Sequence, residues 1–166
     1  MKRARFVEIL ELLTDADVEF VLVGLLAGVL QGAPVTTFDV DIVYRRDPEN
    51  VERLLRVLAR LHAVYRGDPR GLTPQASHLV GPGHQLLFTD LGALDCLGTL
   101  DGVRGYEELL QSTTLIRLDS GRRVRVVTLE ELIAIKRRAG RPKDLAAVPI
   151  LLATLDELRG ATRKPR

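Results

Sequence analysis

The sequence is poor in the residues that mark secreted, zinc-binding and membrane proteins. Its single cysteine, Cys96, cannot form an internal disulfide, and no Cys/His spacing suits zinc. This favours a reducing compartment, and we expect a cytoplasmic protein. The longest apolar run, Phe20 to Leu30, is too short to span a bilayer and contains two glycines. Because Glu8 and Glu11 interrupt the apolar stretch that a signal peptide needs, we expect a soluble protein without a membrane partner.

Aromatic residues are also scarce, at 4% of the chain with no tryptophan, and they do not alternate with basic residues. A stacking platform for single-stranded nucleic acid is therefore not expected. Charge is nearly balanced, with 24 Lys and Arg against 22 Asp and Glu. Between Arg117 and Lys143, however, nine basic residues accompany three acidic ones. This segment can contact phosphates or form a solvated face, and the sequence leaves both interpretations open.

The remaining composition, 46% hydrophobic and 28% charged, is that of an ordinary globular protein. A chain of 166 residues is long enough for one hydrophobic core without disulfide or metal support. We expect a single domain over residues 1–158, followed by a flexible basic tail over residues 159–166.

The order of the expected elements indicates an α/β fold in which a mixed β-sheet is flanked by helices. Hydrophobic periodicity predicts helices over residues 8–13, 25–32, 47–62, 105–111, 128–140 and 141–160. Strands are predicted over residues 19–24, 38–44, 77–80, 84–89, 92–98, 113–118 and 122–127. Asp47 and Thr128 are predicted N-caps, and Gly140 is a predicted helix stop. We expect Pro149 to kink or break the last helix.

Two aspartates interrupt an otherwise apolar strand in the stretch "TTFDVDIVYRR". Residues two apart on a strand share a face, so Asp39 and Asp41 point the same way while Val40 and Ile42 enter the core. Two ionised carboxylates that close repel each other, and Mg²⁺ relieves this repulsion because it takes one or two carboxylates together with water and substrate phosphates. The pair therefore suggests a metal site.

A third acid, Asp95, lies in the apolar stretch "ALDCL". If its strand pairs with the Asp39/Asp41 strand, three carboxylates meet in one place, as a two-metal phosphoryl- or nucleotidyl-transfer site requires. The alternative is that Asp39 and Asp41 lie on the solvent face of an edge strand and Asp95 beside a turn. Upstream, a strand, Gly24 and a helix follow one another, an order in which backbone can approach phosphate groups closely.

The stretch "VLVGLLAGVLQGAPVTTFDVDIVY" resembles the signature of the polymerase-β-like nucleotidyltransferase superfamily. In that signature a strand leads to a pair of small residues that open a helix, and Asp-hydrophobic-Asp follows about a dozen residues later. The stretch "RRAGRPKDLAAVPIL" is similar to the Arg-Pro-Lys-Asp helix of small bacterial abortive-infection toxin-type nucleotidyltransferases. Together the matches span most of the chain.

The resemblance implies that Asp39, Asp41 and Asp95 hold Mg²⁺ or Mn²⁺, and that Asp95 helps to activate the acceptor hydroxyl. It implies that the NTP is bound by residues among Gly24, Leu25, Thr37, Lys136, Arg141, Lys143 and Asp144. The three cations of this set would neutralise phosphate charge, and Asp144 would orient one of them. A solvated helix face is the alternative interpretation for these four charged residues.

Three positions depart from the resemblance. Leu25 stands where the second small residue is expected, while Gln31 and Val35 replace a histidine and an arginine that relatives often carry. We expect the Leu25 side chain to turn toward the core, although it can instead cover the nucleotide site. These changes leave open whether the chain is active or is a catalytically inactive nucleotidyltransferase-like binding module.

The resemblance therefore implies a nucleotidyltransferase that moves an NMP from an NTP to an unidentified acceptor, such as an RNA or protein hydroxyl. It also raises the prediction of a toxin–antitoxin role with a cognate partner protein. His62, His78 and His84 have no acid or nucleophile at motif spacing and are interpreted as surface or loop residues.

Overall fold

The computed structural model describes residues 5–163, which form an α/β fold around one mixed seven-stranded sheet. The strand order is β3-β4-β5-β2-β1-β7-β6, with β2 in the middle. β2 is antiparallel to β1 and parallel to β5, and β1 is parallel to β7. The strands are β1 (Phe20–Val23), β2 (Asp39–Tyr44), β3 (Val64–Tyr65), β4 (His84–Thr89), β5 (Gly92–Leu97), β6 (Thr113–Arg117) and β7 (Arg123–Val127).

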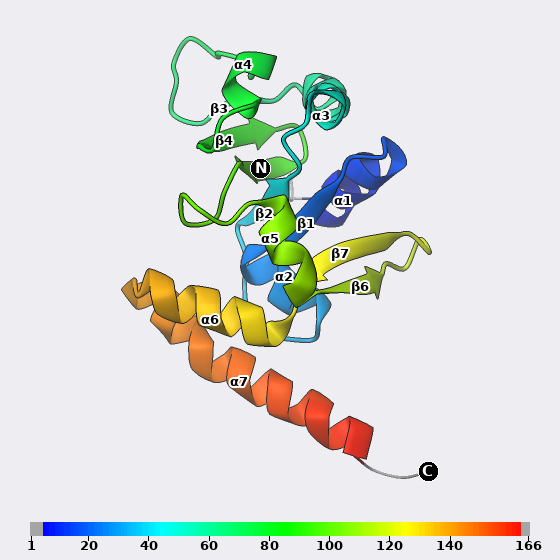
Figure 1. Ribbon diagram of the computed structural model, residues 1–166, viewed down its shortest axis with the longest axis vertical. Coiled ribbons are helices and arrows are strands. Elements are labelled where there is room, and N and C mark those ends of the chain that lie inside the picture. Colours follow the sequence, from blue (N-terminus) through cyan, green and yellow to red (C-terminus); the bar gives the residue numbers. More distant parts are fainter. Residues whose placement is uncertain (1–4, 164–166) are drawn as a thin grey trace.

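Helices flank this sheet, and the order of elements agrees with the predicted mixed α/β architecture. They are α1 (Phe6–Asp15), α2 (Gly24–Leu30), α3 (Pro48–Arg60), α4 (Ala76–Leu79), α5 (Tyr106–Leu109), α6 (Leu129–Ala139) and α7 (Pro142–Arg163), with a 3-10 turn over Leu110–Ser112. α6 and α7 lie side by side at one end of the molecule, whereas α3, α4, β3 and β4 lie at the other end (Figure 1). α2 packs against β1, β2 and α6 and so links the sheet to the α6/α7 end.

The predicted helix ends are confirmed where a cap defines them. The Asp47 carboxylate accepts a hydrogen bond from the Asn50 N–H at the start of α3, and the Thr128 hydroxyl accepts one from the Glu131 N–H at the start of α6. Gly140 ends α6 with a left-handed φ of 66°, a conformation that favours glycine. Two side-chain caps and one left-handed glycine therefore set these three boundaries.

The predicted strand over residues 77–80 is wrong, because the segment forms the short helix α4. Leu79 is fully buried there, and its carbonyl accepts a 2.7 Å hydrogen bond from the Tyr44 hydroxyl. A short apolar run has the same appearance in a buried strand and a buried helical turn, so periodicity could not separate them. The two-residue strand β3 was not predicted, because two residues carry no alternation.

Phe38 was expected inside the aspartate strand, but β2 begins one residue later and Phe38 is 82% exposed. The expected break at Pro149 is also absent, since α7 is one helix with this proline inside it. A proline there removes one backbone hydrogen bond. Burial of Ala147, Val148, Leu151 and Leu155 along α7 offsets that loss.

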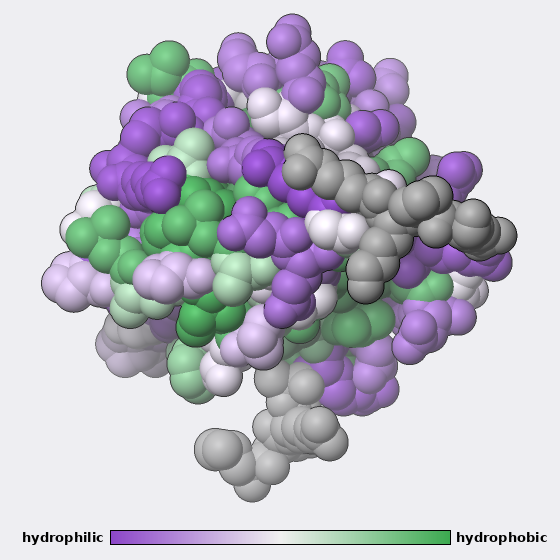
Figure 2. Space-filling model, turned by 90° about the horizontal axis from the view of Figure 1, so that it is seen from below, coloured by the Kyte–Doolittle hydropathy of each residue, from purple (hydrophilic) through white to green (hydrophobic). Residues whose placement is uncertain are grey.

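α7 extends beyond the expected domain end, because it is helical as far as Arg163. Residues 164–166 of the predicted flexible tail lie outside the described part of the chain, and the proposed domain limits stay a prediction. Figure 2 looks at the α6/α7 end of the molecule and shows hydrophobic residues among hydrophilic ones. Leu145, Ile150 and Leu158 of α7 are partly exposed. None of the helices within residues 5–163 has the length and apolar character needed to cross a membrane.

Candidate active site

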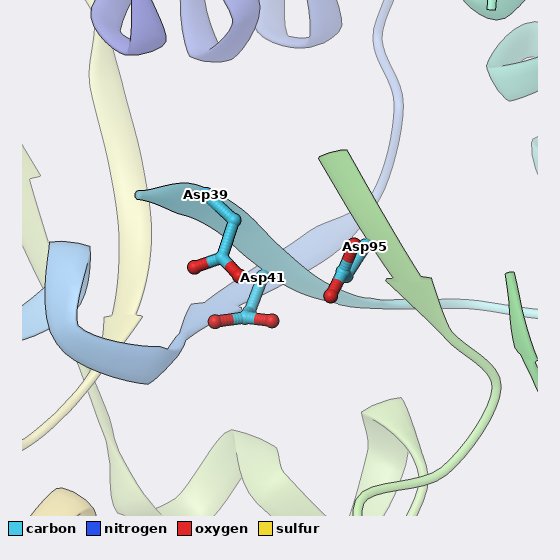
Figure 3. Close-up of side chains that lie close together, drawn as sticks. All are labelled: Asp39, Asp41 and Asp95. Atoms are coloured by element: carbon cyan, nitrogen blue, oxygen red, sulfur yellow. The ribbon is translucent and has the colours of Figure 1, made fainter. Parts of the chain in front are cut away.

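Three carboxylates meet on two neighbouring central strands. β2 and β5 pair in parallel with Asp41 directly beside Asp95, and Asp39 points to the same face from two residues earlier on β2. One oxygen atom of each carboxylate lies within 4.8 Å of the others, as the converging side chains in Figure 3 show. The predicted convergence is therefore confirmed. The alternative placement on an edge strand is wrong, because β2 lies between β1 and β5.

The strand alternation that directs these acids also fills the core. Val40, Ile42 and Cys96 are fully buried on the opposite face of the same two strands. Asp95 is itself only 8% exposed. The acids therefore stand on a rigid, well-packed support.

The cluster is electrostatically unfavourable without a cation. Burial, and then the charges of Asp39 and Asp95, raise the pKa of Asp41 to about 7. Burial also raises the pKa of Asp95, against the opposing charge of Arg66. Among residues 5–163, no basic side chain forms an ion pair with Asp39 or Asp41. Three close oxygen ligands with this deficit of positive charge suit a divalent cation such as Mg²⁺.

Gly24 lies directly against the acid cluster. Val23 at the end of β1 is opposite Asp41, so the chain turns into α2 beside that carboxylate. Gly24 has a φ of 69°, and a Cβ atom added to it would overlap with Asp41 Oδ2. Only glycine therefore fits at this position. The predicted contact of Gly24 with a nucleotide stays a prediction.

The three departures from the resemblance have structural explanations. Leu25 is partly buried and packs against the hydrophobic core, as expected, and Val35 does the same. The Gln31 side-chain amide donates hydrogen bonds to the carbonyls of Ala27 and Val127, at 2.8 and 2.9 Å. Gln31 therefore ties α2 to the end of β7.

The four charged residues predicted at the nucleotide fall into two groups. Asp144 is only 1% exposed and accepts hydrogen bonds from Lys136 Nζ at 2.8 Å and Arg141 Nε at 2.5 Å, so it orients both cations. The positive charge of Lys136 also lowers the pKa of Asp41, so it lies within electrostatic reach of the acids. Lys143 is exposed and takes no part in this arrangement. A nucleotide-binding role for any of them stays a prediction.

Thr37 is joined to the start of β2, since its hydroxyl donates a 2.9 Å hydrogen bond to the Asp39 carbonyl. This contact supports the backbone that carries the acids, and a nucleotide contact by Thr37 is untested.

Sequence reasoning missed Arg66. Its Nη2 donates a 2.5 Å hydrogen bond to Asp95 Oδ1 and thereby forms an ion pair with the third acid. Arg66 lies between the helix predicted over residues 47–62 and the strand predicted over residues 77–80, in a stretch for which the sequence predicts no element, and no local pattern indicates its partner. His84, interpreted as a surface or loop residue, lies on β4, and its charge lowers the pKa of Asp95.

No protein-family model matches the chain, and neither does any curated protein sequence. Solved structures do match it. The lincosamide antibiotic adenylyltransferase LnuA aligns with a TM-score of 0.61 at 15% identity, over 89% of this chain and 94% of that one. ANT(2'')-Ia, solved with adenylyl-2''-tobramycin, aligns with a TM-score of 0.57 at 20% identity, over 95% and 94%. TM1012 from Thermotoga maritima, assigned as a nucleotidyltransferase, aligns with a TM-score of 0.56 at 19% identity, over 89% of both chains.

At these identities the similarity establishes the fold, and closeness to the toxin-type proteins stays a prediction. The central acids, the mixed sheet and these three neighbours agree on one conclusion: the chain has a polymerase-β-like nucleotidyltransferase fold.

Proposed function

We propose that the protein is a metal-dependent nucleotidyltransferase, which transfers an NMP from an NTP to an acceptor hydroxyl and releases pyrophosphate. The observation that carries the proposal is the convergence of Asp39, Asp41 and Asp95 on the central strands of a nucleotidyltransferase fold. Phosphoryl-type transfer needs positioned cations and little covalent chemistry from the protein, which suits a site built from carboxylates.

Asp39, Asp41 and Asp95 are the residues that would hold Mg²⁺ or Mn²⁺. When bound, such ions lower the pKa of the attacking hydroxyl and neutralise the triphosphate. Asp95, which accepts a hydrogen bond from Arg66, would accept the proton of that hydroxyl. Lys136 and Arg141, which both donate hydrogen bonds to Asp144, would supply positive charge near Asp41. Gly24 keeps the backbone close to the site without a side chain in the way.

The test is transfer from α-labelled ATP, GTP, CTP or UTP in Mg²⁺ or Mn²⁺. The acceptors tested should be a lincosamide, an aminoglycoside, tRNA and the proteins of a cell extract. The two antibiotics are included because one structural neighbour was solved with lincomycin and another with adenylyl-2''-tobramycin. The wild type should release labelled pyrophosphate from γ-labelled substrate and label one acceptor class. Asp41→Asn should do neither, whereas Asp156→Asn, an exposed change on α7, should match the wild type.

A wild-type protein that binds no NTP and labels no acceptor would instead favour the inactive binding module. An RNA or protein acceptor, a cognate antitoxin or toxin partner and a cytoplasmic location are further parts of the proposal. Transfer of label to tRNA or to extract proteins tests the acceptor. Co-purification tests the partner protein, and cell fractionation tests the location.

A further inference from the structure

One face of the sheet beside Asp95 is apolar and open. On the three strands at that edge, Leu86 pairs with Asp95, Phe88 with Ala93, and Val64 with Phe88. Because directly paired residues point to the same face, Val64, Leu86 and Phe88 share the face that carries the acids.

The exposures of these side chains show that this face is not covered. Phe88 is 50% exposed and Leu86 is 42% exposed, whereas Leu87 between them is fully buried on the opposite face. β3 and β4 lie at the end of the molecule away from α6 and α7 (Figure 1). We name Val64, Leu86 and Phe88 the β4 surface. An open apolar area that adjoins a set of converging polar groups is typical of a ligand site.

Arg66 joins the β4 surface to the third acid. Its guanidinium carbon lies 5.0 Å from the centre of the Phe88 ring, while its Nη2 binds Asp95 Oδ1 at 2.5 Å and the Leu87 carbonyl at 3.3 Å. The ring, the guanidinium and the carboxylate therefore form one continuous row. A molecule that lies on Phe88 is within reach of Asp95.

The charge of this area limits what can bind it. The side chains that point to the acid face are Val64 of β3, Arg66 just after it, and His84, Leu86 and Phe88 of β4, and none of these five is a carboxylate. A polycationic molecule would find acidic partners there only in the three site aspartates, whose charge a bound divalent cation would neutralise. Among these five side chains a nucleic-acid strand would find no row of unpaired Lys or Arg, because their one arginine, Arg66, is paired with Asp95.

We propose that the β4 surface binds the acceptor substrate, and that this acceptor is an uncharged small molecule with a planar or aliphatic face and a free hydroxyl. The inference rests on the proposed nucleotidyl transfer and specifies its substrate class. The apolar face lies on Phe88 and Leu86, and the hydroxyl points to Asp95. The hydroxyl oxygen forms a bond to the α-phosphorus, its proton passes to the Asp95 carboxylate, the bond from the α-phosphorus to the bridging oxygen breaks, and pyrophosphate leaves.

The experiment measures binding separately from transfer. The probe is 4-methylumbelliferyl β-D-glucoside, which is neutral, planar at one end and rich in hydroxyls, and its binding is followed by saturation-transfer NMR and fluorescence titration. Phe88→Ala and Leu86→Ser should each weaken binding, Phe88→Ala by about tenfold, the size expected for loss of an aromatic contact. Leu115→Ser on β6, a residue with 48% exposure at the other edge of the sheet, should bind like the wild type.

Folding of each variant is checked by circular dichroism and urea unfolding, and Leu86→Ser serves if Phe88→Ala does not fold. Glucosamine tetramer and a short RNA are the competing probes. The inference is overturned if the glucoside shows no saturable binding, if folded variants bind it as the wild type does, or if either competing probe binds more tightly than the glucoside.

The same samples are titrated with NTP and magnesium to separate this inference from the proposed function. NTP binding and pyrophosphate release without Phe88-dependent glucoside binding would refute only the acceptor surface. Phe88-dependent glucoside binding without NTP binding would keep the surface and refute nucleotidyl transfer.

Discussion

Gly24 and Asp41 touch so closely that the site exists only because residue 24 has no side chain. A Cβ atom at Gly24 would overlap with Asp41 Oδ2, and the φ of 69° is in the left-handed region. Gly24→Ala should therefore destabilise the protein by at least the left-handed strain of about 1–2 kcal/mol and displace the Asp41 carboxylate. Urea unfolding measures the first effect, and Mn²⁺ titration should show weaker binding.

The matched control is Gly160→Ala in α7, where a Cβ atom would meet nothing within 4 Å. This substitution should be neutral or stabilise the helix by about 0.5–1 kcal/mol. Equal effects of the two substitutions would contradict a special role for Gly24.

The stability of the metal-free protein should fall as the pH rises from about 4 to 7. The pKa of Asp41 is raised to about 7 in the folded protein, so the folded state holds a proton in this range that the unfolded state has lost. Asp41→Asn should remove most of this slope and leave the metal-free protein as stable as the wild type or more stable at pH 7.5. Urea unfolding of both proteins in EDTA between pH 4.5 and 8 measures the free energy of unfolding at each pH. If Asp41→Asn is unfolded at every pH, Asp41 is a structural residue.

Divalent cations should stabilise the wild type by relieving the repulsion among the three acids. At a Mn²⁺ concentration one hundred times the Kd, the gain is about 2.7 kcal/mol. Asp39→Asn and Asp41→Asn should each reduce the rise in Tm on adding Mn²⁺ or Mg²⁺, whereas Asp156→Asn should not. A rise in Tm that is the same in all four proteins would place the cation elsewhere.

Asp144 should contribute more to folding stability than a surface carboxylate does, because it is buried and accepts hydrogen bonds from two cations. Burial alone would raise the pKa of Asp144, but hydrogen bonds from Arg141 and Lys136 outweigh it and hold this pKa below its ordinary range. Asp144→Asn should cost about 3 kcal/mol at pH 7, because Lys136 is left without its partner. That difference should shrink as the pH falls into the acid range, where the wild-type carboxylate is protonated.

Glu130→Gln is the control for Asp144, since it breaks the exposed Arg159–Glu130 pair between the same two helices. It should cost less than about 1 kcal/mol. Should Asp144→Asn cost no more than this control, the buried contact would not be a stabilising one.

Leu25→Gly should lower stability by up to about 3 kcal/mol without a gain in NTP affinity, because Leu25 packs against the core. Calorimetric titration of both proteins with each NTP in magnesium measures this. Tighter binding by the glycine variant would show that Leu25 covers the site in solution.

Local patterns were sufficient wherever neighbouring residues decide the outcome. The alternation from Asp39 to Ile42 predicts correctly which side chains enter the core and which form the acid face. Cap chemistry at Asp47, Thr128 and Gly140 likewise predicts the helix ends. Local patterns failed at α4 and at Pro149, where burial against other elements outweighs intrinsic preference.

The sequence by itself determined the two faces of the strand that carries Asp39 and Asp41, the main caps and the presence of three candidate carboxylates. Only the tertiary structure decided that Asp95 stands beside Asp41, that Arg66 reaches Asp95, and that Gly24 lies against Asp41. The physical reason is that alternation and capping depend on backbone geometry within a few residues, whereas strand order is selected by the free energy of the whole packed sheet. A contact between distant strands leaves no local periodicity in the chain, and so the site could be suspected from its residues but assembled only by the fold.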